Sequence, residues 1–194
     1  MAKIAILGFG VVGSGAAEVL THNLELIEKR IGQELTIKYI LDLRDFPDSP
    51  FGHLVIHDFD TIVNDPEVSI VAEMMGGSHP AFEFSMACLK AGKSVVTSNK
   101  EVVANFGAEL LLTAKEMGVR YLFEASVGGG IPVIRPIVND LAANSIRSIS
   151  GILNGTTNYI LTQMETSDAD FADALLKVEH RPFVQPVGQA VDLP

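Results

Sequence analysis

The sequence lacks several features that define whole classes of protein. It has one cysteine, Cys88, and no tryptophan. No apolar run approaches the roughly 20 residues that a membrane-spanning helix needs. One cysteine cannot form an intrachain disulfide, and it suits a reducing compartment. We therefore expect a cytoplasmic chain with no membrane span, in which Cys88 is a small buried apolar residue rather than a reactive thiol.

Positive charge is also scarce, because 14 Lys and Arg residues stand against 24 Asp and Glu residues. The net charge of −10 disfavours nucleic acid or an anionic membrane as the main partner. The five histidines, at positions 22, 53, 57, 79 and 180, show no paired spacing typical of metal ligands. The 194 residues suffice for one ordinary domain and the start of a second.

The first two thirds of the chain alternate short apolar runs with amphipathic segments. The apolar runs predict strands at 3–7, 36–41, 69–75, 94–97 and 120–123. The segments between them predict helices at 11–30, between Pro80 and Gly92, and at 101–117, with a loop at 44–50. This alternation is typical of an α/β protein with a Rossmann-type, doubly wound parallel sheet covered on both faces.

The pattern changes after residue 128. A helix is predicted at 132–142, a longer alternating strand at 146–153 and another helix at 156–164. We therefore expect a first domain over residues 1–128, the incomplete start of an α+β domain over 129–175, and a tail over 176–194.

A glycine-rich turn separates the first expected strand from the first expected helix. Its residues are Gly8, Phe9, Gly10, Val11, Val12 and Gly13. Gly8 permits a tight turn, Gly10 lets the backbone approach a pyrophosphate, and Gly13 lets the strand and the helix pack closely. The N–H groups at the start of the helix attract an anion. We predict a dinucleotide site here, the alternative being a structural turn with no ligand.

The choice between NAD and NADP depends on two residues at the end of the second expected strand. Asp42 can accept hydrogen bonds from a ribose 2′-hydroxyl, as NAD requires, whereas Arg44 can pair with the 2′-phosphate of NADP. Both could equally be ordinary surface residues. We favour NADP.

Four later segments are more specific than the glycine turn. They are 73–77 (EMMGG), 95–101 (VVTSNKE), 123–132 (FEASVGGGIP) and 151–159 (GILNGTTNY). In this order, and with the glycine turn before them, they resemble homoserine dehydrogenase over residues 1–175. The resemblance implies NAD(P)-dependent interconversion of L-homoserine and L-aspartate 4-semialdehyde, in threonine, methionine and isoleucine biosynthesis. It also makes the second domain the start of a catalytic and dimerisation domain.

Lys100 follows a strand's carboxyl end, where open parallel sheets bind ligands. Its ammonium could hold a carboxylate, polarise a carbonyl or move a proton, although a surface lysine at a helix start has the same pattern. The resemblance implies that Lys100 is catalytic and contacts cofactor and substrate. It places the nicotinamide near Gly76, Thr97 and Ser98.

Two further sites rest mainly on the resemblance. A sodium-type monovalent cation is expected between the Glu124 side chain and the carbonyls of Val127, Gly129 and Ile131, unless Glu124 only orders the loop. Gly155 and Thr156, at the start of an expected helix, are expected to hold the amino-acid substrate, although ordinary helix capping explains the same residues.

The resemblance ends near Leu176. The family pattern continues with Gly-(Tyr/Phe)-Ala-Glu-x-Asp-Pro and a second essential lysine, whereas this chain has an unrelated tail with prolines that oppose a helix. A frameshift, a truncation or an artificial tail would each produce this departure. We therefore expect weak or absent turnover and a weakened homodimer, the alternative being a dinucleotide-binding fragment without turnover.

Overall fold

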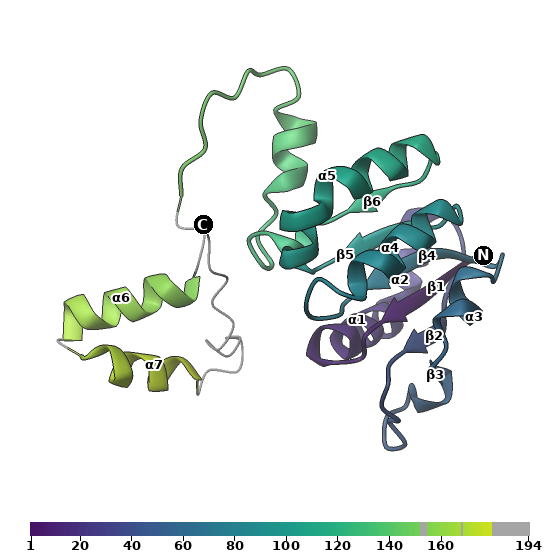
Figure 1. The fold of residues 1–194 in the computed structure, drawn as a ribbon, viewed down its shortest axis with the longest axis horizontal. Helices are drawn as coiled ribbons and strands as arrows, with labels where there is room; N and C mark the ends of the chain where they lie inside the picture. Colours follow the sequence, from purple (N-terminus) through teal and green to yellow (C-terminus); the bar gives the residue numbers. More distant parts are fainter. Residues whose placement is uncertain (152–154, 168, 180–194) are drawn as a thin grey trace. The chain divides into compact units, whose positions relative to one another are not determined.

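The computed structural model describes residues 1–151, 155–167 and 169–179 (Figure 1). The chain divides into two compact units, residues 1–142 and residues 143–194. The first unit contains the sheet, and the described part of the second contains a pair of helices.

The first unit is built on a six-stranded parallel sheet with the strand order β3-β2-β1-β4-β5-β6. Its strands are β1 (Ala2–Leu7), β2 (Leu35–Leu41), β3 (Val55–Ile56), β4 (Val68–Glu73), β5 (Ser94–Thr97) and β6 (Tyr121–Leu122). The order reverses at β1, which pairs with both β2 and β4. In open α/β sheets this switch point is where ligands bind, outside the carboxyl ends of the strands. The predicted α/β, Rossmann-type fold is confirmed.

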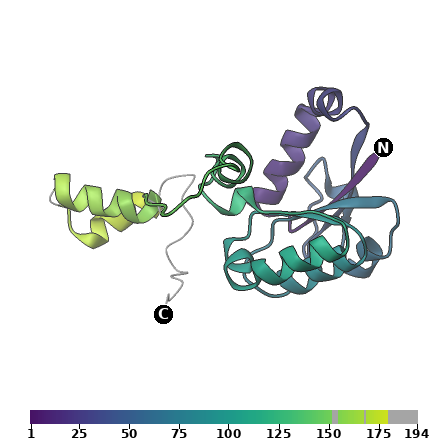
Figure 2. The same ribbon diagram turned by 90° about the horizontal axis from the view of Figure 1, so that it is seen from above.

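Helices cover both faces of this sheet (Figure 2). The helices of the first unit are α1 (Val11–His22), α2 (Leu24–Ile31), α3 (Phe59–Val63), α4 (Ala81–Lys90) and α5 (Lys100–Glu116). Side chains alternate along β1, so Ile4 and Ile6 pack with α1 and α2, whereas Ala5 and Leu7 pack with α3, α4 and α5. Each fully buried Ile or Leu contributes about 1.5–3 kcal/mol of transfer free energy, which fixes the register of β1 between its neighbours.

The single helix predicted at 11–30 is wrong, because the chain leaves the helical conformation at Asn23. The Asn23 backbone has φ −108° and ψ 17°, and its side-chain amide donates to the Val19 carbonyl at 3.1 Å. Asparagine side chains compete with the helix for backbone groups in this way. Helix α2 then ends at Gly32, whose φ of +71° is left-handed.

The segment between β2 and β4 holds elements that the apolar pattern did not predict. Residues 44–50 form a loop as expected, and η1 (Gly52–Leu54), β3 and α3 follow. The Asp58 carboxylate accepts hydrogen bonds from the amides of Asp60 and Thr61 and so caps α3. Because β3 has two residues and α3 has five, neither is long enough to leave a periodic signal.

The chain beyond β6 differs more from the prediction. The turns η2 (Glu124–Ser126) and η3 (Pro136–Asp140) follow β6, and η3 is a short π-helical turn inside the helix expected at 132–142. The strand expected at 146–153 is absent from its described part, 146–151, and its last residues lie outside the described chain. A strand needs a hydrogen-bonded neighbour, and none of the described residues pairs with this segment.

Two helices form the described part of the second unit. They are α6 (Gly155–Ser167) and α7 (Phe171–Glu179), which pack together through Ile160 and Ala174. Helix α6 matches the helix predicted at 156–164.

Cys88 and the helix lengths bear on two further expectations. Cys88 is fully buried on α4, as expected, and burial raises the pKa of its thiol to about 12. Within the described residues, every helix is too short or too polar to cross a lipid bilayer.

Gly13 and Gly15 offer a direct test of the β1–α1 packing. A Cβ on Gly13 would overlap the Gly8 carbonyl oxygen, whereas a Cβ on Gly15 meets no atom within 4 Å. We expect Gly13→Ala to lower the free energy of unfolding by at least about 2 kcal/mol through overpacking. Gly15→Ala should raise it by about 0.5–1 kcal/mol through helix propensity. Urea unfolding would measure both, and equal effects would contradict the close β1–α1 approach.

Candidate functional site

The N-terminus of α1 lies at the carboxyl edge of the sheet, directly after β1. No side chain caps it, since the N-cap residue is Gly10, and the Val11 side chain is 89% exposed. Gly8 forms the turn with φ +90°, and its amide donates to the Leu41 carbonyl at 2.8 Å. The first amides of a helix have no intrahelical acceptor, so α1 presents N–H groups and a positive dipole end to solvent. This arrangement fits a dinucleotide pyrophosphate.

Asp42 joins this turn to the end of β2. One carboxylate oxygen accepts the Phe9 amide at 2.8 Å, and the other accepts the amide and Nε of Arg44, both at 3.0 Å. The Arg44 guanidinium beside Asp42 lowers the pKa of that carboxyl to about 2. The Asp42 side chain is 10% exposed and that of Arg44 is 65% exposed. Of the two residues predicted to select the nucleotide, Arg44 is therefore the accessible one.

The Arg44 guanidinium also lies over the Phe46 ring, 5.0 Å from its centroid. Next to it, the His57 ring contacts the Asp42 carbonyl at 2.7 Å through Nδ1 and the Asp45 carboxylate at 3.1 Å through Nε2. The hydrogen bond to the Asp42 carbonyl raises the pKa of His57. Arg44, after β2, and His57, after β3, therefore place two basic side chains beside Asp42, and sequence reasoning found only Arg44.

A closed ring of hydrogen bonds joins the ends of β4 and β5. Glu73 accepts the Met75 amide at 2.7 Å on one carboxyl oxygen and the Thr97 hydroxyl at 2.5 Å on the other. Thr97 Oγ1 accepts the Asn99 amide at 2.9 Å, and the Asn99 side chain donates to the carbonyls of Met75 (3.3 Å) and Gly77 (2.7 Å). Glu73 is fully buried, and this burial raises the pKa of its carboxyl group.

Asn99 also caps α5, because its side-chain oxygen accepts the amides of Glu101 and Val102 at 3.2 Å. Lys100 is the first residue of this helix and is exposed. The structure thus brings Gly76, Thr97, Ser98 and Lys100 to the carboxyl ends of β4 and β5. Because the sheet is parallel, this is the same edge as the glycine turn.

Sequence reasoning assigned no role to Glu73 or Asn99, although both lie within the segments quoted above. Glu73 ends an apolar strand, and a carboxylate at that position is the one signal that pointed to it. Its partner Thr97 lies 24 residues away, so no local pattern could identify the hydrogen bond between them.

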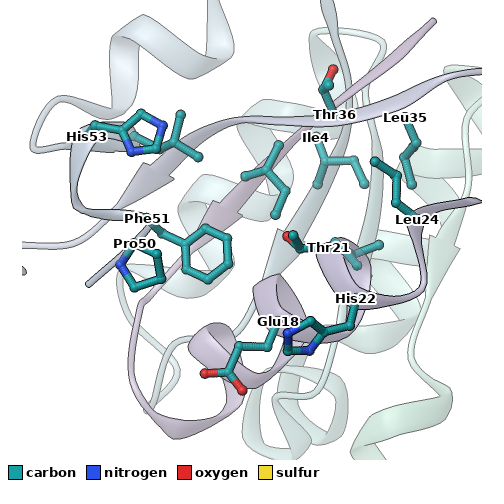
Figure 3. A pocket seen from close by; sticks show the side chains of 13 residues that line it. Ile4, Glu18, Thr21, His22, Leu24, Leu35, Thr36, Pro50, Phe51 and His53 are labelled. Carbon is teal, nitrogen blue, oxygen red and sulfur yellow. The ribbon is translucent and has the colours of Figure 1, made fainter. Parts of the chain in front are cut away.

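Two cavities lie in the first unit. A cavity of about 380 Å³ is lined by Met74, Thr97, Tyr121, Glu124, Arg135 and neighbouring residues, and so includes two predicted site residues. A larger one, of about 730 Å³, lies near the amino ends of β1 and β2, with Phe51 on one side and Thr21 and His22 of α1 on the other (Figure 3). Its lining includes none of the predicted site residues. The larger cavity therefore lies apart from the predicted site residues.

The Glu124 carboxylate is directed at backbone amides. It accepts those of Val133 (2.5 Å), Ile134 (2.9 Å) and Arg135 (2.7 Å), and the bond from Val133 contributes most to lowering the pKa of Glu124. Glu124 therefore orders the segment that follows the glycine-rich loop. A carboxylate has about four lone-pair sites, and three of them are used here.

Gly155 and Thr156, the predicted substrate residues, begin α6 in the second unit. Gly155 is exposed and Thr156 is half-buried. Asn154, the capping residue expected before them, lies outside the described residues.

Comparison with known proteins decides the family. The model of the homoserine dehydrogenase NAD-binding domain matches residues 8–124, which is more than half of the chain. The chain belongs to the homoserine dehydrogenase family. A second model, of homoserine dehydrogenase itself, matches residues 132–186 and so extends past the position where the family pattern was expected to end.

Two curated homoserine dehydrogenases are among the similar proteins. The one from Synechocystis sp. is 40% identical over 190 residues, covering 94% of this chain and 42% of the relative. The one from Neisseria gonorrhoeae is 39% identical over 180 residues, covering 91% of this chain and 41% of the relative. The chain thus spans about two fifths of the length of these relatives.

Solved structures of homoserine dehydrogenases are also similar to this chain. A homoserine dehydrogenase from Thiobacillus denitrificans has a TM-score of 0.85 at 39% identity, covering 92% of this chain and 42% of that one. A hyperthermophilic archaeal homoserine dehydrogenase, solved in complex with NADPH, has a TM-score of 0.78 at 27% identity, covering 92% and 60%.

The lowered pKa of Asp42 predicts a pH dependence of stability. A carboxyl group whose pKa falls from 3.8 to about 2 on folding stabilises the fold above pH 3.8. That stabilisation is lost as the pH falls from 3.8 through 2. Asp42→Asn should therefore cost about 2 kcal/mol at pH 7, and the difference from the unsubstituted chain should shrink below pH 4.

Urea unfolding between pH 2.5 and pH 7 would measure this difference. Asp48→Asn, in an exposed position of the same loop, is the matched control and should change stability by no more than about 0.5 kcal/mol. A constant effect of Asp42→Asn at every pH would contradict the assigned ion pair.

Proposed function

We propose that residues 1–142 bind NAD(P) for a homoserine dehydrogenase reaction, the interconversion of L-homoserine and L-aspartate 4-semialdehyde. One observation carries this proposal. The chain belongs to this family, and the N-terminus of its helix α1, which no side chain caps, lies at the same edge of the parallel sheet as Lys100. The first can hold a dinucleotide, and the second can act on a carbonyl beside it.

The pyrophosphate is proposed to bind over Gly8, Phe9, Gly10, Val11, Val12 and Gly13. The close approach of Gly13 to the Gly8 carbonyl keeps the turn tight enough for the α1 amides to face the phosphates. Gly76, Thr97 and Ser98 are proposed to border the nicotinamide. When bound, the reduced nicotinamide supplies the hydride that converts the aldehyde to the alcohol.

Lys100 is proposed to hold the substrate carbonyl oxygen and to donate the proton that the alkoxide needs. An ammonium at this position stabilises the negative charge that develops on oxygen. Gly155 and Thr156 are proposed to bind the amino-acid end of the substrate through the start of α6.

NADP is proposed as the preferred cofactor. The Asp42 carboxylate already accepts bonds from Phe9 and Arg44, which disfavours its use for a ribose hydroxyl. The exposed Arg44 guanidinium can add a 2′-phosphate, which supports NADP.

Arg44→Leu tests this preference. We expect it to weaken NADPH binding about tenfold or more, because a charge-assisted pair with the 2′-phosphate is lost. NADH binding should stay within about twofold, since NADH lacks the 2′-phosphate that Arg44 is proposed to bind. Titration of reduced-nicotinamide fluorescence would measure both, with Arg30→Leu on α2 as the control. Equal weakening of both cofactors would contradict the role of Arg44.

A sodium-type cation remains a proposal for the loop after β6. The carbonyls of Val127, Gly129 and Ile131 are hard oxygen donors, which suit such an ion, and the remaining lone pair of Glu124 could join them. The family membership supports this proposal more than the geometry does, because three backbone amides already donate to the Glu124 carboxylate.

The activity of the 194-residue chain alone is proposed to be weak or absent, since about three fifths of each curated relative has no counterpart in it. General acid–base groups contribute about 10²–10⁴ in rate, so the loss of one leaves little turnover. A binding-only chain, with a homodimer weakened or lost, is the second candidate.

The deciding experiment is oxidation of L-homoserine by the purified chain, with NADP and NAD in parallel at mildly alkaline pH. We expect NADPH binding by the folded chain and little or no homoserine-dependent reduction. Failure to bind either dinucleotide would contradict the main proposal. Rapid turnover would contradict the expected weakness and would confirm the substrate.

The role of Lys100 can be tested only in a protein that catalyses the reaction, which a fusion with a relative would provide. Residues 1–142, fused to the remaining part of the Synechocystis relative, should catalyse the reaction, and Lys100→Ala should lower kcat about 100-fold or more. Lys115→Ala, in the last turn of the same helix, should leave kcat unchanged. Equal kcat values for the fusion and for Lys100→Ala would remove Lys100 from the mechanism.

A further inference from the structure

We propose that Glu73 is a positioning residue for the proposed reaction, which holds Lys100 and the Met75–Gly77 backbone in place through the ring of Thr97 and Asn99. This inference rests on the proposed function but goes beyond it. It assigns a task to a buried carboxyl group that does not itself contact solvent.

The ring explains why a carboxylate stands at this position. The Met75 amide and the Thr97 hydroxyl both donate, so the side chain between them must accept at both ends. A glutamine of the same length accepts at one end only and places an amide hydrogen against one of the two donors. Glutamate meets this requirement at the cost of burying its charge.

The donor and acceptor of each hydrogen bond in the ring connect the Glu73 carboxylate to the start of α5. Because the Thr97 hydroxyl donates to Glu73, its oxygen is left to accept the Asn99 amide. That bond fixes the Asn99 backbone in the extended conformation of an N-cap residue, from which its side chain holds the first turn of α5. Lys100 begins that turn, so its Cα position follows from the Glu73 acceptor.

The same ring holds the loop after β4. The Asn99 side-chain amide donates to the Met75 and Gly77 carbonyls, and the Met75 amide returns to Glu73. The backbone around Gly76 is therefore tied on both sides. Two of the regions proposed to meet the nicotinamide, this loop and the start of α5, thus share one anchor.

Three variants test the inference in the 194-residue chain. Glu73→Gln replaces one of the two acceptor oxygens with an amide donor, Thr97→Val removes the hydroxyl, and Thr97→Ser keeps it. Ser85→Ala, on α4, is the matched control, because it removes a buried hydroxyl that has no hydrogen-bond partner among the described residues. Amide hydrogen exchange, global unfolding in urea and NADPH affinity are measured for each.

We expect Glu73→Gln and Thr97→Val to speed exchange of the Asn99, Glu101 and Val102 amides about tenfold beyond any change in global stability. Core amides such as those of Ile6 and Val71 should change only in proportion to global stability. NADPH binding should weaken about threefold to tenfold in both variants. Thr97→Ser should keep the exchange rates and the NADPH affinity of the unsubstituted chain, and Ser85→Ala should match that chain as well.

Other results would overturn the inference. If exchange accelerated equally at all amides in Glu73→Gln, Glu73 would be an ordinary core residue. The same conclusion would follow if the variant lost stability without a change in NADPH affinity. If the unsubstituted chain bound no dinucleotide, the proposed function and the positioning of a cofactor site would both fail. The exchange pattern would then still report whether the ring anchors α5, so the two failures are distinguishable.

Discussion

The parallel pairing of β1 with both β2 and β4 is the constraint on which the rest of the structure depends. It places the glycine turn between two neighbouring strand ends, where the Gly8 amide donates to Leu41 and the Met74 amide donates to Leu7. A Cβ on Gly8 would lie 3.0 Å from the Met74 carbonyl oxygen, so the neighbours themselves exclude a larger residue. The shape of the turn is thus set by the hydrogen bonds of the sheet and by the close packing around Gly8.

The two sides of this turn use charge in opposite ways. On the β2 side, Asp42 and Arg44 form a pair whose cation is solvent-exposed and can exchange part of its contact for a ligand phosphate. On the β4 side, Glu73 is buried and its bonds are internal, so it can only hold the backbone. Under the proposed function, the exposed Asp42–Arg44 pair would select the nucleotide, and the buried Glu73 ring would position the reacting groups.

The sequence predicted those features that leave a local pattern. The apolar runs located five of the six strands, and the glycine spacing located the turn, because both depend on neighbouring residues. The break at Asn23 and the ring of Glu73 depend on single side chains bonding to particular backbone or distant groups, which periodicity does not record. The strand expected at 146–153 had suitable residues, but within the described chain no neighbour pairs with it. Alternation alone does not make a strand.

Under the proposed function, dinucleotide binding and substrate turnover would depend on different parts of the chain. The α1 N-terminus, Arg44, the Glu73 ring and Lys100 all lie within residues 1–142, and the hydrogen bonds of the Arg44–Asp42 pair and of the Glu73 ring are internal to that unit. The proposed substrate residues Gly155 and Thr156 belong to the second unit. Changes in the second unit should therefore act on turnover and on the choice of amino acid, whereas nucleotide choice should follow Arg44. A chain that binds NADPH without turnover would have lost substrate placement rather than the fold of its cofactor site.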